Sequence, residues 1–243
     1  MTDWRMEYQP ESDTLELRLY DTIDGDGWFT ESETSAKAIA KKLAEMPNAK
    51  EIKIFINSLG GSVMEGLGIY NQLKRHSAHK TVYIDGFACS IASVIAMAGD
   101  TVIMPKNAVM MIHNAWVVAA GNAAQLRKTA DDLDVINAAS VQAYLDKAGD
   151  KLSPEKLTEM LDAETYLTAD QCIELGLADK YDDSEEEETD TAKAEAVELA
   201  KQQAYNEEMQ RRHERAMAVI NKYFLNTGFL KCSSQGTQNL SEK

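Results

Sequence analysis

Cysteine, basic residues and long apolar runs are all scarce in this 243-residue chain. Its three cysteines, Cys89, Cys172 and Cys232, are odd in number and lack metal-ligand spacing, so neither a disulfide framework nor a zinc site is expected. No apolar run approaches the ~20 residues that a membrane-spanning helix needs. The N-terminus also lacks the basic-then-apolar order of a secretory signal. We therefore expect a soluble protein from a reducing compartment.

The charge balance is acidic and uneven. Lys and Arg total 25 against 40 Asp and Glu, a formal net charge of −15, which disfavours binding to nucleic-acid phosphates or anionic membranes. Seven of the acids fall within residues 182–190 without a basic residue, which predicts a solvated linker. A helix from Thr191 to about Tyr223 is expected after it. We therefore divide the chain into a compact domain, 1–181, and a tail, 182–243.

The compact domain alternates between strand-like and helix-like patterns. Strands are expected near 15–19, 52–56, 81–84, 102–104 and 109–112. Helices are expected after a Thr30/Glu33 capping box, over 63–70, from Gly86–Ser90 to about Ala98, over 122–147, and after the caps Ser153 and Thr168. This alternation predicts an α/β fold with a mostly parallel sheet, whose chemistry lies at strand–loop–helix junctions.

Ser90 is the first candidate for chemistry. It follows a predicted strand and is flanked at both second neighbours by Ala88 and Ala92, as a nucleophile on a sharp turn requires. The alternative is that Ser90 only caps the next helix. Cys89 is more consistent with a buried small hydrophobe than with a second nucleophile.

Two further features could complete a hydrolytic site. Gly60 and Gly61 follow an Ile-rich strand and leave backbone N–H groups uncovered, which suits an oxyanion hole, although an ordinary tight turn has the same pattern. His113 ends the apolar run 109–112, where a neutral imidazole could act as a general base or pack as a core residue. No dinucleotide or Walker motif is present, so nucleotide binding has little support.

The acidic partner of a catalytic histidine is the least determined member. Asp162 and Glu164 both precede the helix capped by Thr168, and either could orient His113 and stabilise its imidazolium. The alternative is that both are exposed loop acids.

Taken together, several ordered blocks resemble the Clp protease proteolytic subunit family, and most closely its phage and prophage branch, the Clp-related head maturation proteases. The resemblance spans roughly residues 14–181. It is carried by Ile56-Asn57-Ser58-Leu59-Gly60-Gly61-Ser62, Gly86-Phe87-Ala88-Cys89-Ser90-Ile91-Ala92-Ser93, Met110-Met111-Ile112-His113, Glu164-Thr165-Tyr166-Leu167-Thr168-Ala169 and Glu174-Leu175-Gly176-Leu177-Ala178-Asp179.

The resemblance implies a crotonase-like, ClpP-like ββα superhelix with a long handle helix, here followed by an acidic linker and helical tail. It implies Ser90 as nucleophile and His113 as base, with the N–H groups of Gly61 and Ile91 forming the oxyanion hole and Gly60 contacting substrate. Glu164 falls where the housekeeping subunit has Asp, and Asp162 is the fallback. No cofactor or metal is implied.

The function expected from this resemblance is ATP-independent serine endopeptidase action on a phage capsid or scaffold protein. The setting would be the bacterial host cytoplasm or the phage prohead, and the handle helix implies a ring-shaped homo-oligomer. Alternatives are a general peptidase working with an unfoldase ATPase, a crotonase-fold acyl-CoA enzyme, a Ser–Lys peptidase and a non-enzymatic assembly module built on the tail.

Overall fold

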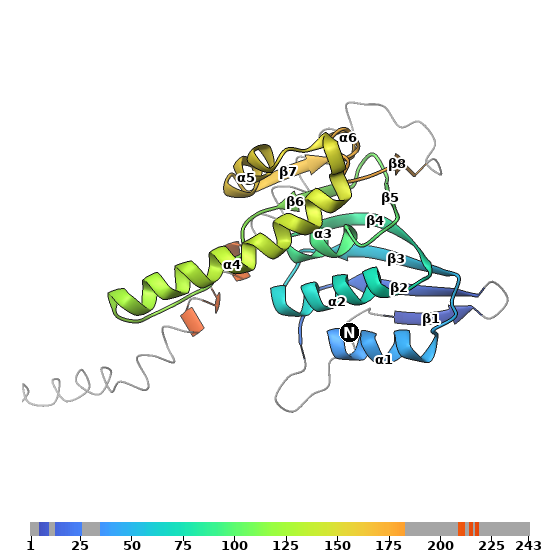
Figure 1. Cartoon of the computed structure of the whole chain (residues 1–243), viewed down its shortest axis with the longest axis horizontal. Coiled ribbons are helices and arrows are strands. Elements are labelled where there is room, and N and C mark those ends of the chain that lie inside the picture. The colour runs from blue at the N-terminus through green and yellow to red at the C-terminus, as the bar shows by residue number, and fades with distance from the viewer. Residues whose placement is uncertain are drawn as a thin grey trace, which may run out of the picture.

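The structure is a computed structural model that describes residues 5–9, 13–25, 35–182, 209–211, 214–215 and 217–218 (Figure 1). The strands are β1 (Arg5–Gln9), β2 (Thr14–Tyr20), β3 (Glu51–Ser58), β4 (His79–Cys89), β5 (Thr101–Met104), β6 (Val109–Ile112), β7 (Thr165–Thr168) and β8 (Lys180–Tyr181). The helices are α1 (Ala36–Glu45), α2 (Val63–Arg75), α3 (Ile91–Ala96), α4 (Ala123–Ala148), α5 (Pro154–Asp162) and α6 (Ala169–Glu174), with the short 3-10 turn η1 (Gly149–Lys151) after α4.

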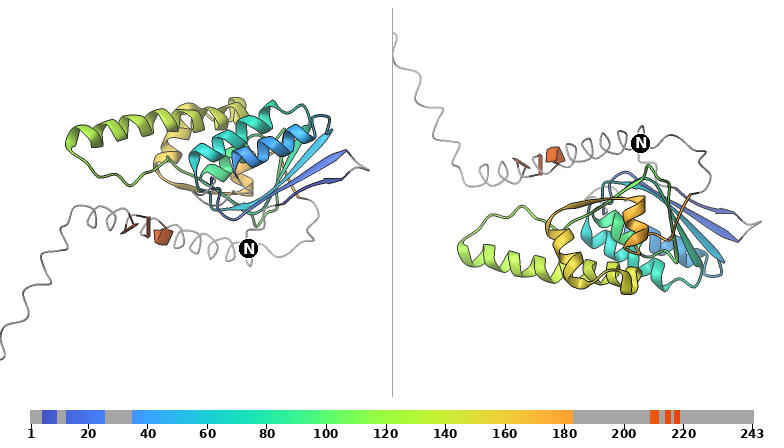
Figure 2. Two further views of the ribbon diagram at one scale, coloured as in Figure 1. Left: turned by 90° about the horizontal axis from the view of Figure 1, so that it is seen from below. Right: turned by 90° about the horizontal axis from the view of Figure 1, so that it is seen from above.

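The strands of the described ranges form one sheet in the order β1-β2-β3-β4-β5-β8, while β6 extends from β4 and carries β7. The β2–β3, β3–β4, β4–β5, β4–β6 and β5–β8 pairs are parallel, and only β1–β2 and β6–β7 are antiparallel. The expected mostly parallel α/β sheet is therefore confirmed. Figure 2 shows α1 and α2 together on one face of this sheet.

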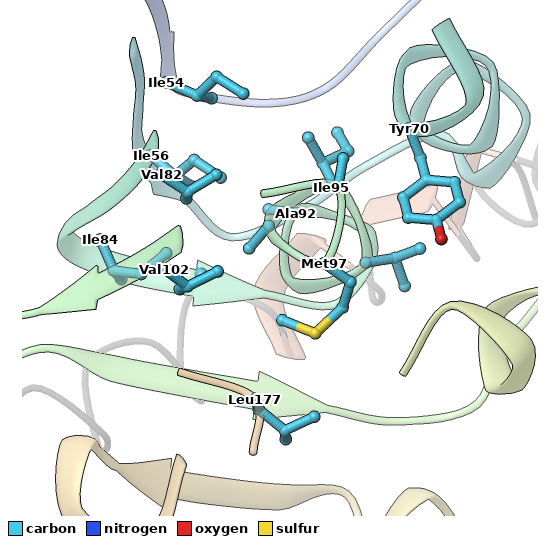
Figure 3. Packing of buried hydrophobic residues seen from close by; sticks show 14 of the residues in the cluster. Ile54, Ile56, Tyr70, Val82, Ile84, Ala92, Ile95, Met97, Val102 and Leu177 are labelled. Carbon is cyan, nitrogen blue, oxygen red and sulfur yellow. The ribbon is translucent and has the colours of Figure 1, made fainter. Parts of the chain in front are cut away.

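The core follows from the alternation of side chains along the strands. Leu15, Leu17 and Leu19 of β2 are at most 2% exposed, and the isoleucines at 52, 54 and 56 of β3 are fully buried on the same face. Figure 3 shows β3 and β4 side chains packing against Ile95 of α3. The short helix α3 is buried at every position, so the segment that begins at Ser90 is held on all sides.

One predicted element is wrong in its bounds. The segment 86–89 does not open a helix: it continues β4, because Ala88 pairs with Ser58 of β3 and Phe87–Cys89 pair with β6. The first helix is capped by Ser35, whose side chain accepts from the Ala38 N–H, whereas the expected capping box at 30–33 lies outside the described residues.

The long helix expected over 122–147 is confirmed as α4, which begins with a complete capping box formed by Asn122 and Gln125. At 26 residues it is about 39 Å long. Its buried residues are Ala143, Tyr144 and Ala148, all close to its C-terminal end. Figures 1 and 2 show the other end projecting beyond the body of the sheet.

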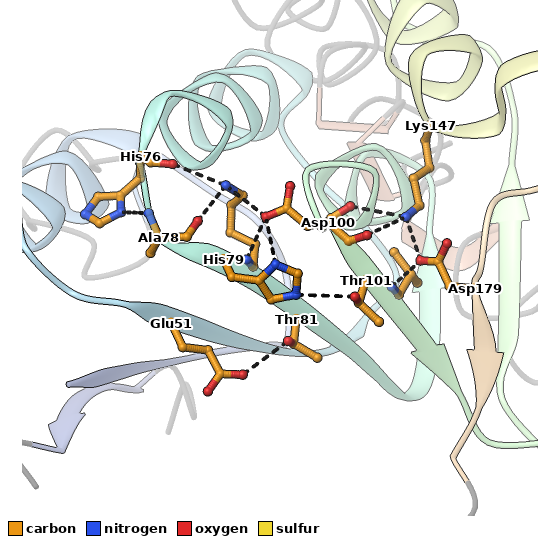
Figure 4. Close-up of polar contacts among 12 residues, drawn as sticks. Glu51, His76, Ala78, His79, Thr81, Asp100, Thr101, Lys147 and Asp179 are labelled. Carbon is orange, nitrogen blue, oxygen red and sulfur yellow. Dashed lines mark hydrogen bonds and ion pairs between the residues drawn. The ribbon is translucent and has the colours of Figure 1, made fainter. Parts of the chain in front are cut away.

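The C-terminal end of α4 is fixed by charge as well as by packing (Figure 4). The ammonium of Lys147 lies 2.6 Å from Asp179 Oδ2, which also accepts from the Val102 N–H. Nearby, the buried ammonium of Lys80 lies 3.1 Å from Asp100 Oδ2 and donates to the Ala78 carbonyl. This network ties α4 to the start of β5 and to the edge of the sheet.

Of the expected tail helix, the residues that the structure describes (209–211, 214–215 and 217–218) are helical. The acidic linker expected over 182–190 lies outside the described residues except for Asp182. No helix in the described parts of the chain is both long enough and apolar enough to cross a membrane.

Candidate active site

Ser90 occupies a sharp turn between β4 and α3. Its backbone has φ 54° and ψ −130°, a left-handed conformation that L-residues rarely adopt and that costs on the order of 1–3 kcal/mol. The turn is held by the Ser90 N–H, which donates to the Met111 carbonyl of β6 at 2.8 Å. The side chain makes no helix-capping hydrogen bond. The capping interpretation of Ser90 is therefore wrong, and its hydroxyl is available for another partner.

That partner is His113. The imidazole Nε2 lies 2.7 Å from Ser90 Oγ, a normal hydrogen-bond distance. Residue 113 directly follows β6, and β6 pairs in parallel with the end of β4, so the two strand ends meet. His113 is 8% exposed, which shields the pair from bulk water without closing it off. The arrangement allows the imidazole to accept the hydroxyl proton.

The double glycine lies directly against this turn. A Cβ added to Gly60 would lie 2.7 Å from the Ser90 Cβ and 3.3 Å from the Ile91 nitrogen, so only glycine allows this approach. Gly61 bridges in parallel with Ile23, whose N–H and carbonyl bond to the residues on either side of Gly61. In such a bridge the N–H of the central residue points away from the partner strand. The Gly61 N–H therefore faces away from Ile23.

The two candidate acids have different neighbours. Asp162 Oδ1 accepts from the Asn114 side-chain amide at 2.7 Å. Glu164 comes immediately before β7, where Thr165 pairs with Ile112, so one further step of this antiparallel register sets Glu164 opposite His113. Glu164 has φ 49°, a second left-handed residue near the site. The pairing ends at Ile112–Thr165; continued by one residue, it would favour Glu164 over Asp162 as the neighbour of His113.

A small pocket lies next to Ser90. Its lining comes from the loop after β2, the β3–α2 turn, the loop after β6 and the tail, and comprises Thr22, Leu59, Gly60, Gly61, Ser90, Trp116, Arg211 and Arg215. The Arg215 guanidinium lies over the Trp116 ring, 6.0 Å from its centroid. Trp116 and the arginines could not be predicted as site residues, because no local pattern connects residue 116 with residues about 100 positions later.

A buried hydroxyl pair supports the Ser90 turn from behind. Ser93 Oγ donates to the Ser90 carbonyl at 2.5 Å and lies 2.6 Å from the Tyr144 hydroxyl of α4. Burial raises the pKa of Tyr144, so the phenol stays protonated and able to donate. Sequence reasoning did not identify this pair either, since a serine in an apolar helix and a tyrosine in a polar one carry no motif.

The remaining candidates play structural parts. Cys89 is buried, in line with the expected small hydrophobe. His76 Nε2 lies 3.2 Å from the Met46 carbonyl. His79, at the start of β4, lies 3.3 Å from the Thr101 hydroxyl, whereas Ser90 follows the other end of that strand (Figure 4). Within the described ranges, no group of three or more His, Cys, Asp or Glu side chains is arranged to hold a metal ion.

Comparison with known proteins gives a consistent result. The family model described as Clp protease matches residues 29–184. Curated relatives named "ATP-dependent Clp protease proteolytic subunit" include proteins from two strains of Bacteroides fragilis, each 33% identical over 134 residues, and one from Ligilactobacillus salivarius, 31% identical over 133 residues. Each match covers 54% of this chain. It covers 63%, 60% and 66% of the respective relatives, so the chain spans less than two thirds of their length.

Proposed function

The chain belongs to the Clp protease family, and from that premise we propose that it is a serine endopeptidase with Ser90 as nucleophile and His113 as general base. One observation carries the proposal: the Ser90 hydroxyl, on a left-handed turn and free of any capping role, lies 2.7 Å from His113 Nε2. A strained turn is retained only where the surrounding structure compensates for it, and such residues cluster at functional sites.

The proposed reaction follows from this geometry. Ser90 Oγ attacks the carbonyl carbon of a peptide bond while its proton passes to His113 Nε2. The N–H groups of Gly61 and Ile91 donate to the oxyanion of the tetrahedral intermediate. His113 then gives its proton to the leaving amine, and water hydrolyses the acyl-enzyme through the same base. Gly60 keeps the turn close to Ser90 so that an extended substrate can approach.

Glu164 is proposed as the acid that orients His113. The β6–β7 register supports this assignment, and Asp162 is already bonded to Asn114. A carboxylate here would fix the imidazole tautomer and stabilise the imidazolium formed during attack. Glutamate is one methylene longer than aspartate, and the backbone of Glu164 is left-handed, so its side chain would leave the main chain in a different direction from that of an extended residue.

A fluorophosphonate probe provides the direct test. It should label Ser90, and labelling should be lost in Ser90→Ala and strongly slowed in His113→Ala. Ser77→Ala, which alters an exposed serine outside the site, is the matched control and should label like the parent. Labelling that persists in Ser90→Ala, or fails in the parent under conditions where circular dichroism shows a folded protein, would refute the proposal.

For the biological role we propose processing of a phage capsid or scaffold protein, without an ATPase. The support is the resemblance of the sequence blocks to the phage branch of the family. Co-expression with a candidate capsid protein, followed by mass spectrometry of the products, tests this role. Cleavage by the parent but not by Ser90→Ala is expected. An unchanged capsid protein would contradict it.

The competing role is general proteolysis with an unfoldase, and the name of the curated relatives, "ATP-dependent Clp protease proteolytic subunit", favours it. ATP-dependent degradation of an unfolded protein by the chain plus a Clp ATPase, with no capsid cleavage, would establish that role instead. The acyl-CoA, Ser–Lys and non-enzymatic alternatives have no comparable support from the Ser90–His113 geometry.

We also propose that the chain forms a ring through α4, with residues 1–181 as the catalytic unit and 182–243 as an appended tail. Support comes from apolar side chains exposed on this helix, notably Val135 at 74% and Leu126 at 43%. Val135→Glu should lower the mass measured by light scattering, whereas Asp131→Asn, on the same helix, should not. An unchanged mass in Val135→Glu would contradict assembly through α4.

A further inference from the structure

The pocket beside Ser90 is walled on one side by the chain's own tail. Arg211 and Arg215 line the same pocket as Ser90 and Gly61. A substrate whose carbonyl is attacked by Ser90 must enter this space. The two arginine side chains and the residues that flank a scissile bond therefore compete for one volume.

Trp116 is the pocket residue suited to hold a cation. The Arg215 guanidinium lies over its ring at 6.0 Å from the centroid, within the range of a cation–π interaction. The other described residues of the lining, apart from the two arginines, are Thr22, Leu59, Gly60, Gly61 and Ser90, and none of these carries a charge. Recognition of a cation here must therefore use the indole face.

The charge of the chain reinforces this selection. Residues 1–181 contain 27 Asp and Glu against 17 Lys and Arg, whereas residues 211–215 read Arg-Arg-His-Glu-Arg. An acidic body raises the local concentration of cationic segments at its surface. A tail on the same chain gains further, because its binding is intramolecular and has a high effective concentration.

We propose that Trp116 is a specificity-determining residue that accepts a cationic side chain of the substrate, and that Arg215 of the tail occupies this position until substrate displaces it. The proposal rests on the peptidase function proposed above and names its substrate class: segments with arginine or lysine close to the scissile bond. It also makes the tail a competitive occupant of the pocket.

Competition and selection make separate kinetic predictions. If Arg215 competes with substrate, Arg215→Gln should lower KM and leave kcat unchanged. For an exposed cation–π contact the expected change is about two- to five-fold. If Trp116 selects the cation, a peptide with arginine near the cleaved bond should have a higher kcat/KM than the same peptide with glutamine, by a similar factor.

The experiment uses the full chain and an internally quenched peptide library in which arginine is scanned across both sides of the cleaved bond. Trp116→Leu should abolish the arginine preference, and Trp116→Phe should restore part of it because an aromatic face remains. Arg75→Gln, at the exposed end of α2, is the matched control for Arg215→Gln and should not change KM. Added salt should lower the KM of the parent for an uncharged peptide by weakening tail binding, and change it less in Arg215→Gln.

Two results would overturn the inference while leaving the peptidase assignment intact. The first is an arginine preference that survives Trp116→Leu, or no preference in the parent. The second concerns the tail. Either an unchanged or higher KM in Arg215→Gln, or Ser90-dependent cleavage of the tail seen by intact mass, would show that the tail is not a competitor of the substrate. By contrast, no hydrolysis and no fluorophosphonate labelling in the parent would refute the proposed function itself.

Discussion

The hydroxyl pair behind the Ser90 turn can be tested by removing each hydroxyl separately and then both. Tyr144→Phe removes the phenolic hydroxyl but leaves Ser93 Oγ with the Ser90 carbonyl as its acceptor. Ser93→Ala instead leaves the Tyr144 hydroxyl in a fully buried position with no partner from Ser93. The two single variants therefore differ in what they leave unsatisfied.

The expected magnitudes follow from that difference. Loss of a satisfied hydrogen bond costs about 0.5–1.5 kcal/mol, whereas a buried hydroxyl without a partner costs about 1–3 kcal/mol. We expect Ser93→Ala to be the more destabilising variant. The double variant, which removes both hydroxyls, should be no less stable than Ser93→Ala alone, so the two changes are not additive.

Urea denaturation at a single fixed protein concentration measures these free energies, because any self-association makes stability depend on concentration. Peptide hydrolysis measures the functional effect. Since Ser93 holds the carbonyl of Ser90, the proposed nucleophile, Ser93→Ala should lower kcat more than it raises KM. Tyr70→Phe, which alters another buried tyrosine, is the matched control and should leave kcat unchanged.

Additive stability losses would refute the reasoning, because they would show that the two hydroxyls do not depend on each other. An equal loss of kcat in Tyr70→Phe would likewise show that the effect on the nucleophile is a general result of core disturbance.

Four further variants test other parts of the site and fold. Gly61→Ala would set a Cβ 2.0 Å from the Ile23 carbonyl oxygen at φ 153°, so we expect a loss of more than about 1 kcal/mol in urea denaturation together with loss of hydrolysis; parental activity would contradict this. Glu164→Gln should lower kcat at least about tenfold, and Asp162→Asn should not, so the reverse order would pass the acid role to Asp162. Burial alone would raise the pKa of Asp100, but hydrogen bonds from Lys80 hold it below its usual value; this carboxylate therefore stabilises the fold above its unfolded pKa, and the contribution is lost as pH falls through the lower folded pKa. Asp100→Asn should flatten the acid side of a stability-against-pH curve, and an unchanged curve would contradict this.

Five of the eight described strands and most helix boundaries could be predicted because their signals are local, whereas β1, β7 and β8 were not predicted. Alternation identified β2 and β3, and the capping residues Ser153 and Thr168 mark the true starts of α5 and α6. The predicted end of β4 was wrong because the segment 86–89 has no strong local preference for strand or helix. Pairing with β3 and β6, which are distant in sequence, makes it a strand.

The candidate site divides in the same way. Ser90, His113 and the double glycine lie at strand ends, where a parallel sheet gathers chemistry, so the sequence alone suggested them. Trp116 and Arg215 meet only through tertiary folding. Nothing near residue 215 indicates that its side chain lines the pocket beside Ser90, and only a structure could show it.

Helix α4 is anchored near its C-terminal end and projects from the body of the fold at its N-terminal end. Its innermost supports, Tyr144 and Lys147, lie within one helical turn of each other, and its outermost hydrogen bond to the body is from the Ala115 N–H to Asn137 Oδ1. From Asn137 to Ala123 the helix extends by about 21 Å, so a rotation of about 5° about Asn137 moves its N-terminal end by roughly 2 Å. The loop that carries His113 leads to the N-terminal end of α4. Near the C-terminal end, Tyr144 bonds to Ser93, which donates to the Ser90 carbonyl. Both ends of α4 are thus connected to the Ser90–His113 pair: the N-terminal end through the loop that follows His113, and the C-terminal end through the Tyr144–Ser93–Ser90 hydrogen bonds.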